Sequence, residues 1–446
     1  MIKEENAHFS RKNVEALAEW KGEPDWMREQ RLAAFEIFEK TRFPGKKDED
    51  WRRTDISALE YARYLAFEAQ SETPATDFRQ LPELAQSALD HRNDLTNLLV
   101  HHNSAPIFHR LHRSAEQSGV LFMDLDRAVR QHPDLVRQYF MKTSPQGRED
   151  KFVALHGAFW LGGTLLYVPK NAKVELSFRS LHLMSRFNAP AFSHTLIIVD
   201  EGAEATFFEE LLSPEGDRQG FADIVVEIFV KPRARFQYVS LQNYGRNVYS
   251  FMHKRAHVER DATMNWLVGT FGSKLSKSVI GSVLVGPGSC TEMLGVGFGD
   301  SNQHIDQNTL QIHQAPRTKS DLLFNTALKE KARAIYKGTI DVVHAAQKTD
   351  AYQKNRNLVI GREARADSMP ALEILANDVR CTHGATVGNV DADQVFYLMS
   401  RGLTRDRAVK IVVDGFFEPV LRRVPDESIV ERMRKIVDSK TANIVV

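Results

Sequence analysis

Apolar side chains in the first part of the chain recur at the spacing of amphipathic helices. Pro24 suits the first turn of a helix, and the Phe-Pro-Gly-Lys-Lys run at residues 43–47 interrupts the pattern. The apolar positions that carry this helical period are Leu17, Trp20, Trp26, Leu32, Phe35, Ile37 and Phe38. A further helix is expected to start at Pro133 and to run to about residue 142. Residues 1–150 are therefore predicted to form a mostly helical region.

The pattern changes after a turn-forming run at residues 144–147. Short stretches rich in aliphatic and β-branched residues follow, at residues 165–168, 195–199 and 223–230. No long helical pattern returns before about residue 391. Residues 151–388 are therefore predicted to form a β-rich core.

This core carries an internal repeat, in which an aliphatic residue is followed four positions later by a small residue, with turn-forming residues between them. Successive copies begin 27 to 32 residues apart, apart from one interval of 43. The pairs are Val168 and Ala172, Val199 and Ala203, Val230 and Ala234, Val258 and Ala262, Val285 and Ser289, Leu328 and Ala332, and Ile360 and Ala364. A strand, a tight corner, a small inward residue and a new strand, repeated, predict a parallel β-helix, or β-solenoid.

Helical spacing returns in residues 389–446. Asp391 or Asp393 can cap a helix that runs to Ser400, and Gly402 suits the position after its end. Thr404 can cap a second helix, and a third is expected to begin at residues 425–426. Helices beside a solenoid can cover its strand edges, and an apolar helical face can also dock a partner.

Composition narrows the classes of function. The 59 basic and 58 acidic side chains give a net charge of +1, so there is no electrostatic reason to expect nucleic acid or an anionic membrane as a partner. No run approaches the roughly 18 apolar residues of a membrane-spanning helix, and the first residues lack an apolar signal segment. Two cysteines do not suggest a disulfide framework, so the expected location is the cytoplasm, with both thiols reduced.

Residues 381–388 read Cys-Thr-His-Gly-Ala-Thr-Val-Gly and contain one of the two cysteines. In an extended strand Cys381 and His383 point to the same face, which places a thiol beside an imidazole. Such a pair is half of a site for zinc or for an iron–sulfur cluster, which usually takes about four ligands. The alternative is a buried cysteine beside a hydrogen-bonded histidine, and Cys290 is expected to be a small core residue.

Two other motifs were candidates for different chemistry. His304 and Asp306, together with His313 or His344, could form the facial triad of a non-haem Fe(II) oxygenase. The run at residues 269–274 lacks the spacing of a phosphate loop, so we expect no nucleotide hydrolysis by this chain.

The run at residues 381–388 continues into Asp-Ala-Asp-Gln-Val-Phe-Tyr-Leu-Met-Ser-Arg-Gly-Leu at residues 391–403. Together they resemble the C-terminal signature of the SufD group in the SufB/SufD family, whose members are subunits of the SUF iron–sulfur cluster assembly complex. The resemblance covers nearly the whole chain and includes residues 23–26, 49–52, 162–169 and 370–374. SufB carries Glu-His-Glu-Ala-Thr where this chain has Cys-Thr-His-Gly-Ala-Thr, as well as extra cysteines, so the chain is more similar to SufD.

The resemblance implies a right-handed parallel β-helix between helical regions, in a complex with SufB, a β-helix paralogue, and SufC, an ABC-type ATPase. It implies that His383 is a ligand of a transient iron–sulfur cluster shared with SufB, that Cys381 is a weaker candidate, and that residues 389–446 dock SufC. The residues expected to contact partners are Phe396, Tyr397, Arg401, Gly402, Phe416 and Phe417.

The role expected from this resemblance is that of a non-catalytic scaffold, with no permanently bound cofactor and with a homodimer of the isolated chain left open. The alternatives are the oxygenase and a purely structural β-helix brace.

Overall fold

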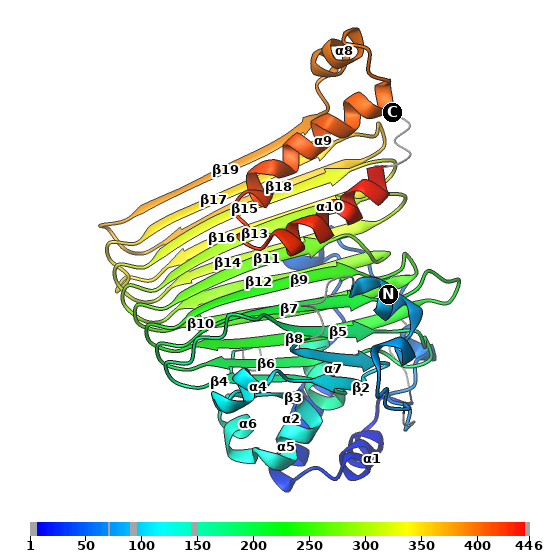
Figure 1. The fold of residues 1–446 in the computed structure, drawn as a ribbon, viewed down its shortest axis with the longest axis vertical. Helices are drawn as coiled ribbons and strands as arrows, with labels where there is room; N and C mark the ends of the chain where they lie inside the picture. The colour runs from blue at the N-terminus through cyan, green and yellow to red at the C-terminus, as the bar shows by residue number, and fades with distance from the viewer. Residues whose placement is uncertain (1–6, 70–71, 90–95, 144–149, 442–446) are drawn as a thin grey trace.

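The computed structural model describes residues 7–69, 72–89, 96–143 and 150–441, and over these ranges the chain winds into a β-solenoid (Figure 1). From β4 onward each turn contributes one strand to each of two sheets, so that neighbours within a sheet are two strands apart in chain order. The predicted fold, mainly β with helical regions at both ends, is confirmed.

The first sheet has ten strands, in the order β19-β17-β15-β13-β11-β9-β7-β5-β1-β2. Its strands are β1 (Leu98–His102), β2 (Ala105–Arg110), β5 (Phe178–Leu183), β7 (Glu204–Leu212), β9 (Arg235–Asn243), β11 (Thr263–Thr270), β13 (Cys290–Gly299), β15 (Lys319–Leu328), β17 (Asp350–Val359) and β19 (Arg380–Asn389). The second sheet has nine strands, in the order β18-β16-β14-β12-β10-β8-β6-β4-β3. Its strands are β3 (Leu121–Asp124), β4 (Gly163–Val168), β6 (His194–Val199), β8 (Gly220–Val230), β10 (Val248–Val258), β12 (Leu275–Leu284), β14 (His304–His313), β16 (Arg333–Val342) and β18 (Arg365–Ile374).

The helices gather at the two ends of the chain. Before the solenoid lie α1 (Arg11–Lys21), α2 (Asp25–Lys40), α3 (Glu83–Ala88), α4 (Arg113–Gln117), α5 (Leu125–Gln131), α6 (Pro133–Tyr139) and α7 (Lys151–Phe159), with short 3₁₀ turns at Glu49–Trp51, Tyr61–Arg63 and Phe78–Gln80. After it lie α8 (Ala392–Ser400), α9 (Arg405–Leu421) and α10 (Glu427–Thr441).

The strands of the solenoid pair in parallel and in register, so that side chains from successive turns stack in columns. In β10, for example, Met252 lies opposite Ile224 of β8 and Ser278 of β12. Alternate residues point between the two sheets, and in β8 these are Ala222, Ile224, Val226, Ile228 and Val230, all at most 1% exposed. One apolar core therefore runs through the N-terminal turns, and removing this surface from water stabilises the stack.

The four-residue repeat marks corners of the solenoid, but on two different sides. The first five pairs lie where the chain leaves the nine-stranded sheet, and the last two, which begin at Leu328 and Ile360, lie where it leaves the ten-stranded sheet. The interval of 43 residues between Val285 and Leu328 therefore corresponds to one and a half turns of the solenoid and is not an insertion. On the first side, the residue before each small one has a positive φ, as at Arg233 (63°). The small residue is fully buried at four of these five corners, as at Ala234, and Ala172 is partly buried.

The N-terminal region is helical only in part. Strands β1, β2 and β3 belong to it and extend both sheets, and β1–β2 and β3–β4 pair antiparallel at that end of the solenoid. The expectation of a mostly helical region missed these strands, because strands of four to six residues carry little periodic signal. Helix α7 was also missed, since all nine of its residues are buried and it has no polar face. The pattern change at residues 144–147 lies outside the described residues.

The three C-terminal helices begin where their caps were expected. Asp391 accepts hydrogen bonds from the backbone N–H groups of Asp393 and Gln394, Thr404 accepts one from Arg407, and Asp426 precedes α10. Helices α9 and α10 lie along the ten-stranded sheet, whereas α8 projects beyond the end of the solenoid (Figure 1).

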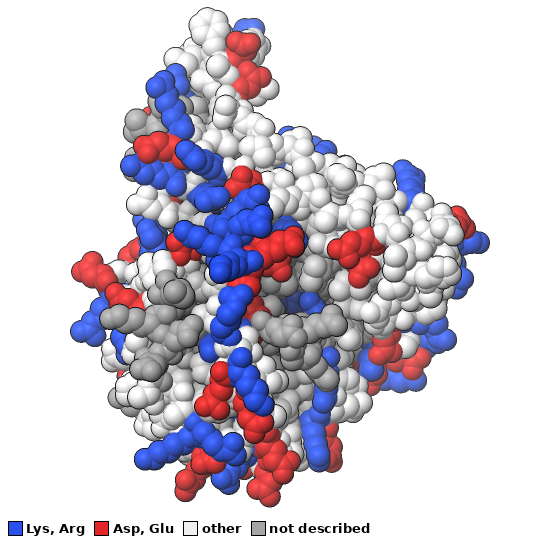
Figure 2. Space-filling model, turned by 180° about the vertical axis from the view of Figure 1, so that it is seen from behind, with Lys and Arg blue, Asp and Glu red and all other residues white. Residues whose placement is uncertain are grey.

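Basic and acidic side chains are interleaved on the face seen in Figure 2. Exposed ion pairs of the solenoid include Lys331–Glu363 at 3.4 Å and Arg333–Asp367 at 2.9 Å. None of the helices in the described ranges is long and apolar enough to cross a membrane.

Candidate functional site

Cys381 and His383 lie on β19, the last strand of the ten-stranded sheet. Strand β17 pairs with one side of β19, where Cys381 lies opposite Ala351 and His383 lies opposite Gln353. Ala351 and Gln353 are each 1% exposed and face the space between the sheets, so Cys381 and His383 continue two inward-facing columns. The solenoid ends here, and this is why the inward position of His383 is exposed to solvent.

The two side chains have different surroundings. Cys381 is half-buried and packs against a buried cluster that includes Val342, Ala351 and Ala376. This burial, reinforced by the Asp350 carboxylate, raises the pKa of the Cys381 thiol above its ordinary value. The exposed His383 ring has no hydrogen-bond partner among the described residues.

No group of three or more His, Cys, Asp and Glu side chains in the described ranges is arranged to hold a metal ion. Within these residues Cys381 and His383 therefore supply two side chains at most to any metal site. An imidazole and a thiol side by side suit a soft or borderline metal such as iron or zinc.

The end of the solenoid at β18 and β19 is open, unlike the end at β2 and β3. Both terminal strands are ten residues long, and neither is followed by another strand in its sheet. Apolar side chains here are exposed, including Ile374 (37%), Leu375 (67%) and Val387 (50%). An exposed strand edge of this length presents unpaired backbone groups, which makes it a template for another chain.

Helix α8 presents a second exposed apolar surface. Phe396 is 72% exposed, Tyr397 is 56% exposed and Met399 is 40% exposed. Cavities of about 620 and 700 Å³ lie on the two sides of this helix. Large apolar side chains in such a projecting position are typical of a protein–protein contact.

The other residues predicted to contact partners lie at the end of α8 and on α9, and they differ in how far they are buried. The Arg401 guanidinium donates a hydrogen bond to the Tyr397 hydroxyl at 3.2 Å, and Gly402 ends the helix with a φ of 92°. Phe416 is partly buried, with the Arg356 guanidinium 5.1 Å from its ring centre. Phe417 is 1% exposed and packs toward the sheet, so its side chain belongs to the core and is not part of a docking surface.

The structure gives the predicted oxygenase triad no support. His304 and His313 stand at opposite ends of β14, nine residues and therefore roughly 30 Å apart along the strand. The Asp306 carboxylate accepts a hydrogen bond from the Lys277 ammonium at 2.7 Å and another from the Thr54 hydroxyl. His304 contacts the same Thr54 hydroxyl at 3.1 Å. These polar groups join β14 to the N-terminal region instead of converging on a metal.

Cys290 begins β13 and is half-exposed, so it is not the core residue that the sequence suggested. Burial raises the pKa of its thiol, although Lys319 lies next to it in the sheet and lowers this pKa. Cys290 and Cys381 are both free thiols on separate strands.

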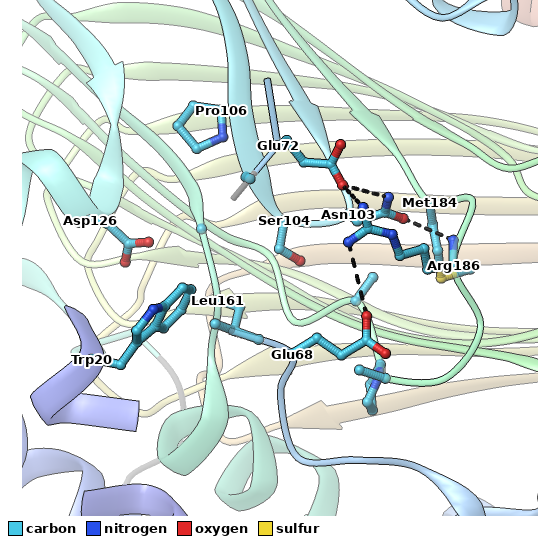
Figure 3. Close-up of a pocket in the computed structure, with 15 residues that line it drawn as sticks. Trp20, Glu68, Glu72, Asn103, Ser104, Pro106, Asp126, Leu161, Met184 and Arg186 are labelled. Carbon is cyan, nitrogen blue, oxygen red and sulfur yellow. Dashed lines mark hydrogen bonds and ion pairs between the residues drawn. The ribbon is translucent and has the colours of Figure 1, made fainter. Parts of the chain in front are cut away.

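A separate cavity of about 280 Å³ lies at the N-terminal end of the molecule (Figure 3). On one wall the Arg186 guanidinium contacts the Glu72 carboxylate at 2.7 Å and the Glu68 carboxylate at 4.0 Å. Trp20 lines the same cavity. It contains none of the predicted site residues, and its charged groups are largely paired with one another.

The sequence did not reveal the open edge itself. Which strands are terminal depends on pairing between residues about 30 positions apart, and the repeat alone does not say on which turn the stack stops. A signal was present in the composition of β19, which has the small and polar sequence RCTHGATVGN instead of alternating apolar residues.

The fold and this edge define a class of protein: a β-solenoid with one open end that carries a cysteine and a histidine. Residues 182–416 match the family described as "SUF system FeS cluster assembly, SufBD core domain", and residues 11–179 match the "SufBD protein N-terminal region". The chain therefore belongs to the SufBD family of iron–sulfur cluster assembly proteins.

Relatives with the name "Iron-sulfur cluster assembly SufBD family protein" span almost the same length as this chain. Those of Staphylococcus epidermidis and Staphylococcus haemolyticus are 31% identical over 433 residues, which is 95% of this chain and 91% of the relative. The relative of Staphylococcus aureus is 30% identical over the same length.

Proposed function

We propose that the chain is a SufD-type, non-catalytic scaffold subunit of a cytoplasmic SUF complex, and that it takes part in building an iron–sulfur cluster at its junction with SufB. The observation that carries this proposal is the position of His383, exposed on the last strand of an open solenoid, with Cys381 two residues away on the same face. The assignment to SufD rests on the Cys-Thr-His-Gly-Ala-Thr run and on the presence of only two cysteines.

In this proposal the cluster is cargo, and its ligand set is shared between two chains. The neutral imidazole of His383 supplies a nitrogen ligand to iron, and SufB supplies thiolate. A mixed set of nitrogen and sulfur ligands holds a cluster less firmly than four thiolates, which suits a site that has to release its product. Because protonated imidazole cannot bind iron, cluster formation is expected to weaken at low pH.

Cys381 has a secondary part in this proposal. Its thiol must lose a proton before the sulfur binds iron, and the burial that raises its pKa opposes this loss in the isolated chain. An iron ion held by His383 would favour the thiolate, so that Cys381 would join the ligand set after iron arrives.

The exposed face of α8, with Phe396 and Tyr397, is the proposed docking surface for the SufC ATPase. ATP-driven closure of two SufC subunits would then move this chain and SufB relative to one another and change the geometry at their shared edge. The SUF complex would use the hydrolysis of ATP in SufC to open or strain a site that this chain only helps to form.

The test is co-expression with candidate SufB and SufC subunits, followed by measurement of iron and acid-labile sulfide in the purified complex. His383→Ala is expected to lower both contents several-fold while all three subunits still co-purify. His344→Ala is the matched control, since His344 is an exposed histidine in the loop after β16. Unchanged iron and sulfide in the His383→Ala complex would overturn the ligand role and would leave the chain as a structural brace.

A further inference from the structure

The residue next to His383 on the neighbouring strand is a buried glutamine. Gln353 of β17 is the register partner of His383 of β19 in a parallel pair, and paired strands lie about 4.8 Å apart. Both residues belong to one inward-facing column, in which Gln353 is only 1% exposed. The imidazole at the open end and the amide on the neighbouring strand are therefore successive members of the same column of side chains.

The orientation of the Gln353 amide follows from one contact across the interior. Its Nε2 donates a hydrogen bond to the backbone carbonyl of Gly338 on β16 at 3.3 Å. A carbonyl oxygen only accepts hydrogen bonds, so the NH₂ end of the amide has to face Gly338. Gly338 also leaves the space for this contact, because a Cβ atom at that position would collide with the Gln353 Nε2.

The other end of this amide, Oε1, is buried and has no hydrogen-bond partner in the part of the chain that the structure describes. The amide of Asn355 differs, since its Oδ1 accepts hydrogen bonds from the Asn357 amide at 2.6 Å and from the Ser368 hydroxyl at 2.8 Å. A buried oxygen without a donor destabilises a fold, so each such atom in a native structure calls for an explanation. The Gln353 Oε1 is an acceptor that the described fold does not use.

We propose that Gln353 is a positioning residue for His383. When one ring nitrogen of His383 binds iron, the N–H of the other ring nitrogen donates a hydrogen bond to the Gln353 Oε1. The inference rests on the proposed function, namely on His383 as an iron ligand. Histidines that bind metals almost always donate their second N–H to an acceptor, and this bond fixes the tautomer and the orientation of the ring.

Such a bond matters most for a side chain as exposed as that of His383. An exposed imidazole with no partner in the described ranges samples several orientations and both neutral tautomers, and only some of these present a free nitrogen to iron. A buried amide on a paired strand offers one fixed acceptor and thereby selects among them. Cys381 has no such support, because its register partner is Ala351.

The neutral amide also suits a site that has to release its product. A carboxylate in this place would raise the basicity of the ring and strengthen its bond to iron. An amide oxygen carries no net charge, so it orients the ring with a smaller gain in affinity.

The test measures iron and acid-labile sulfide in the complex co-purified with SufB-type and SufC-type subunits. Gln353→Met keeps the length of the side chain and removes the acceptor, so both contents are expected to fall several-fold while all three subunits still co-purify. Gln353→Glu retains an oxygen that accepts a hydrogen bond, so both contents should stay at or above the wild-type level. Contents that are unchanged in Gln353→Met, or that fall equally in the two variants, would overturn the proposal.

Gln311→Met is the matched control. Gln311 of β14 is also fully buried, its Nε2 donates to the Ser320 hydroxyl at 2.7 Å, and its Oε1 likewise lacks a partner within the described ranges. Strand β14 pairs with β12 and β16 and not with β19, so Gln311→Met should leave the iron and sulfide contents unchanged. A fall as large as that in Gln353→Met would show that a disturbed interior causes the loss, and this result would also overturn the proposal.

Gly338→Ala acts on the same amide from the opposite sheet. The added methyl group would displace the Gln353 amide, so iron and sulfide should fall although Gln353 itself is unchanged. This variant decides the question if Gln353→Met does not fold. Unchanged contents in folded Gly338→Ala would then overturn the proposal.

Combination with His383→Ala separates this inference from the proposed function. If Gln353 acts through His383, Gln353→Met adds no further loss of iron to the His383→Ala complex. A further loss would overturn the positioning role. Unchanged contents in His383→Ala alone would refute the ligand role itself, whereas a fall in His383→Ala without a fall in Gln353→Met would refute only the role of Gln353.

Discussion

His383 and Cys381 differ, as single residues, in how ready each is to bind iron. The imidazole is exposed and has no hydrogen-bond partner in the described ranges, so it can bind without first giving up a contact. The thiol is half-buried with a raised pKa, so it has to be deprotonated first. The histidine is therefore the better candidate for the first contact with iron.

The buried carboxyl group of Asp223 lowers the stability of the folded state. It is fully buried, and neither of its carboxylate oxygens has a hydrogen-bond partner among the described residues. Burial, reinforced by the Asp150 carboxylate, raises the pKa of Asp223 well above its ordinary value. Folded Asp223 therefore holds its proton to a higher pH than the unfolded chain does, and the folded state loses stability as the pH rises above the usual range of aspartate.

Asp223→Asn is expected to raise the free energy of unfolding, and the gain should be larger at pH 8 than at pH 5. The reason is that the amide carries no charge at either pH, so the stability lost by the wild type with rising pH is not lost by the variant. Urea unfolding at the two pH values measures both numbers. Asp378→Asn, at an exposed position, is the control and should behave like the wild type. A gain that is equal at both pH values would contradict the assigned pKa direction.

At the scale of elements, a buried ion pair fixes the N-terminal helices to the solenoid. The Arg31 guanidinium of α2 is fully buried, contacts Glu23 at 2.6 Å and donates to the backbone carbonyls of Ala158 and Trp160. Both carbonyls lie at the end of α7 or just after it, so this one side chain joins α2 to the segment that leads into β4.

Glu23→Ala is expected to lower the free energy of unfolding by about 3–5 kcal/mol, because it leaves the Arg31 charge buried without a partner. The exposed pair Lys331–Glu363 provides the comparison, with side chains 61% and 67% exposed. Glu363→Ala should cost only about 0–1 kcal/mol. Chemical denaturation of both variants measures the difference, and equal costs would show that burial of the pair does not matter.

The sequence predicted that Phe396 of α8 and Phe417 of α9 both contact partners, but the structure places them differently. Phe417 is buried against the sheet, so Phe417→Ala should lower the free energy of unfolding by about 3–5 kcal/mol. Phe396 on α8 is exposed, so Phe396→Ala should leave stability unchanged and weaken binding of the SufC-type ATPase in a pull-down or calorimetric titration. Full binding by stable Phe396→Ala protein would remove α8 from the proposed docking surface.

Elements with a strong local sequence signal were predicted, and elements with a weak one were missed. The caps at Asp391 and Thr404 were predictable, because capping depends on one side chain and the next few backbone groups. Helix α7 and the strands β1–β3 were not, since a helix buried on every side has no polar face and very short strands have little period. The burial of Phe417 and the exposure of Phe396 depend on the docking angles of α8 and α9, and these do not follow from helical spacing alone.

At the scale of the whole molecule, the solenoid has a closed end and an open one. Strands β2 and β3 end the two sheets with antiparallel pairs and are accompanied by the N-terminal helices (Figure 1), whereas β18 and β19 end them with parallel pairs. The adjacency of Cys381 and His383 was predictable from their spacing of two. Their place at the open end was not, because it depends on how many turns the chain completes.

This asymmetry leads to a prediction for backbone hydrogen exchange in the isolated chain and in the assembled complex. In β19 the N–H groups of Arg380 and Val390 donate to Thr349 and Val359 on the β17 side, so the amides of the odd-numbered residues face the open side. The amides of His383, Ala385 and Val387 should therefore exchange rapidly in the isolated chain and become protected when the partner solenoid pairs with β19. The amides of Thr382 and Thr386 face β17 and should be protected in both states. Strand β2, at the closed end, serves as the internal control and should not change on assembly. Protection that appears at the closed end, or equally on both sides of β19, would show that the complex assembles through a surface other than the open edge.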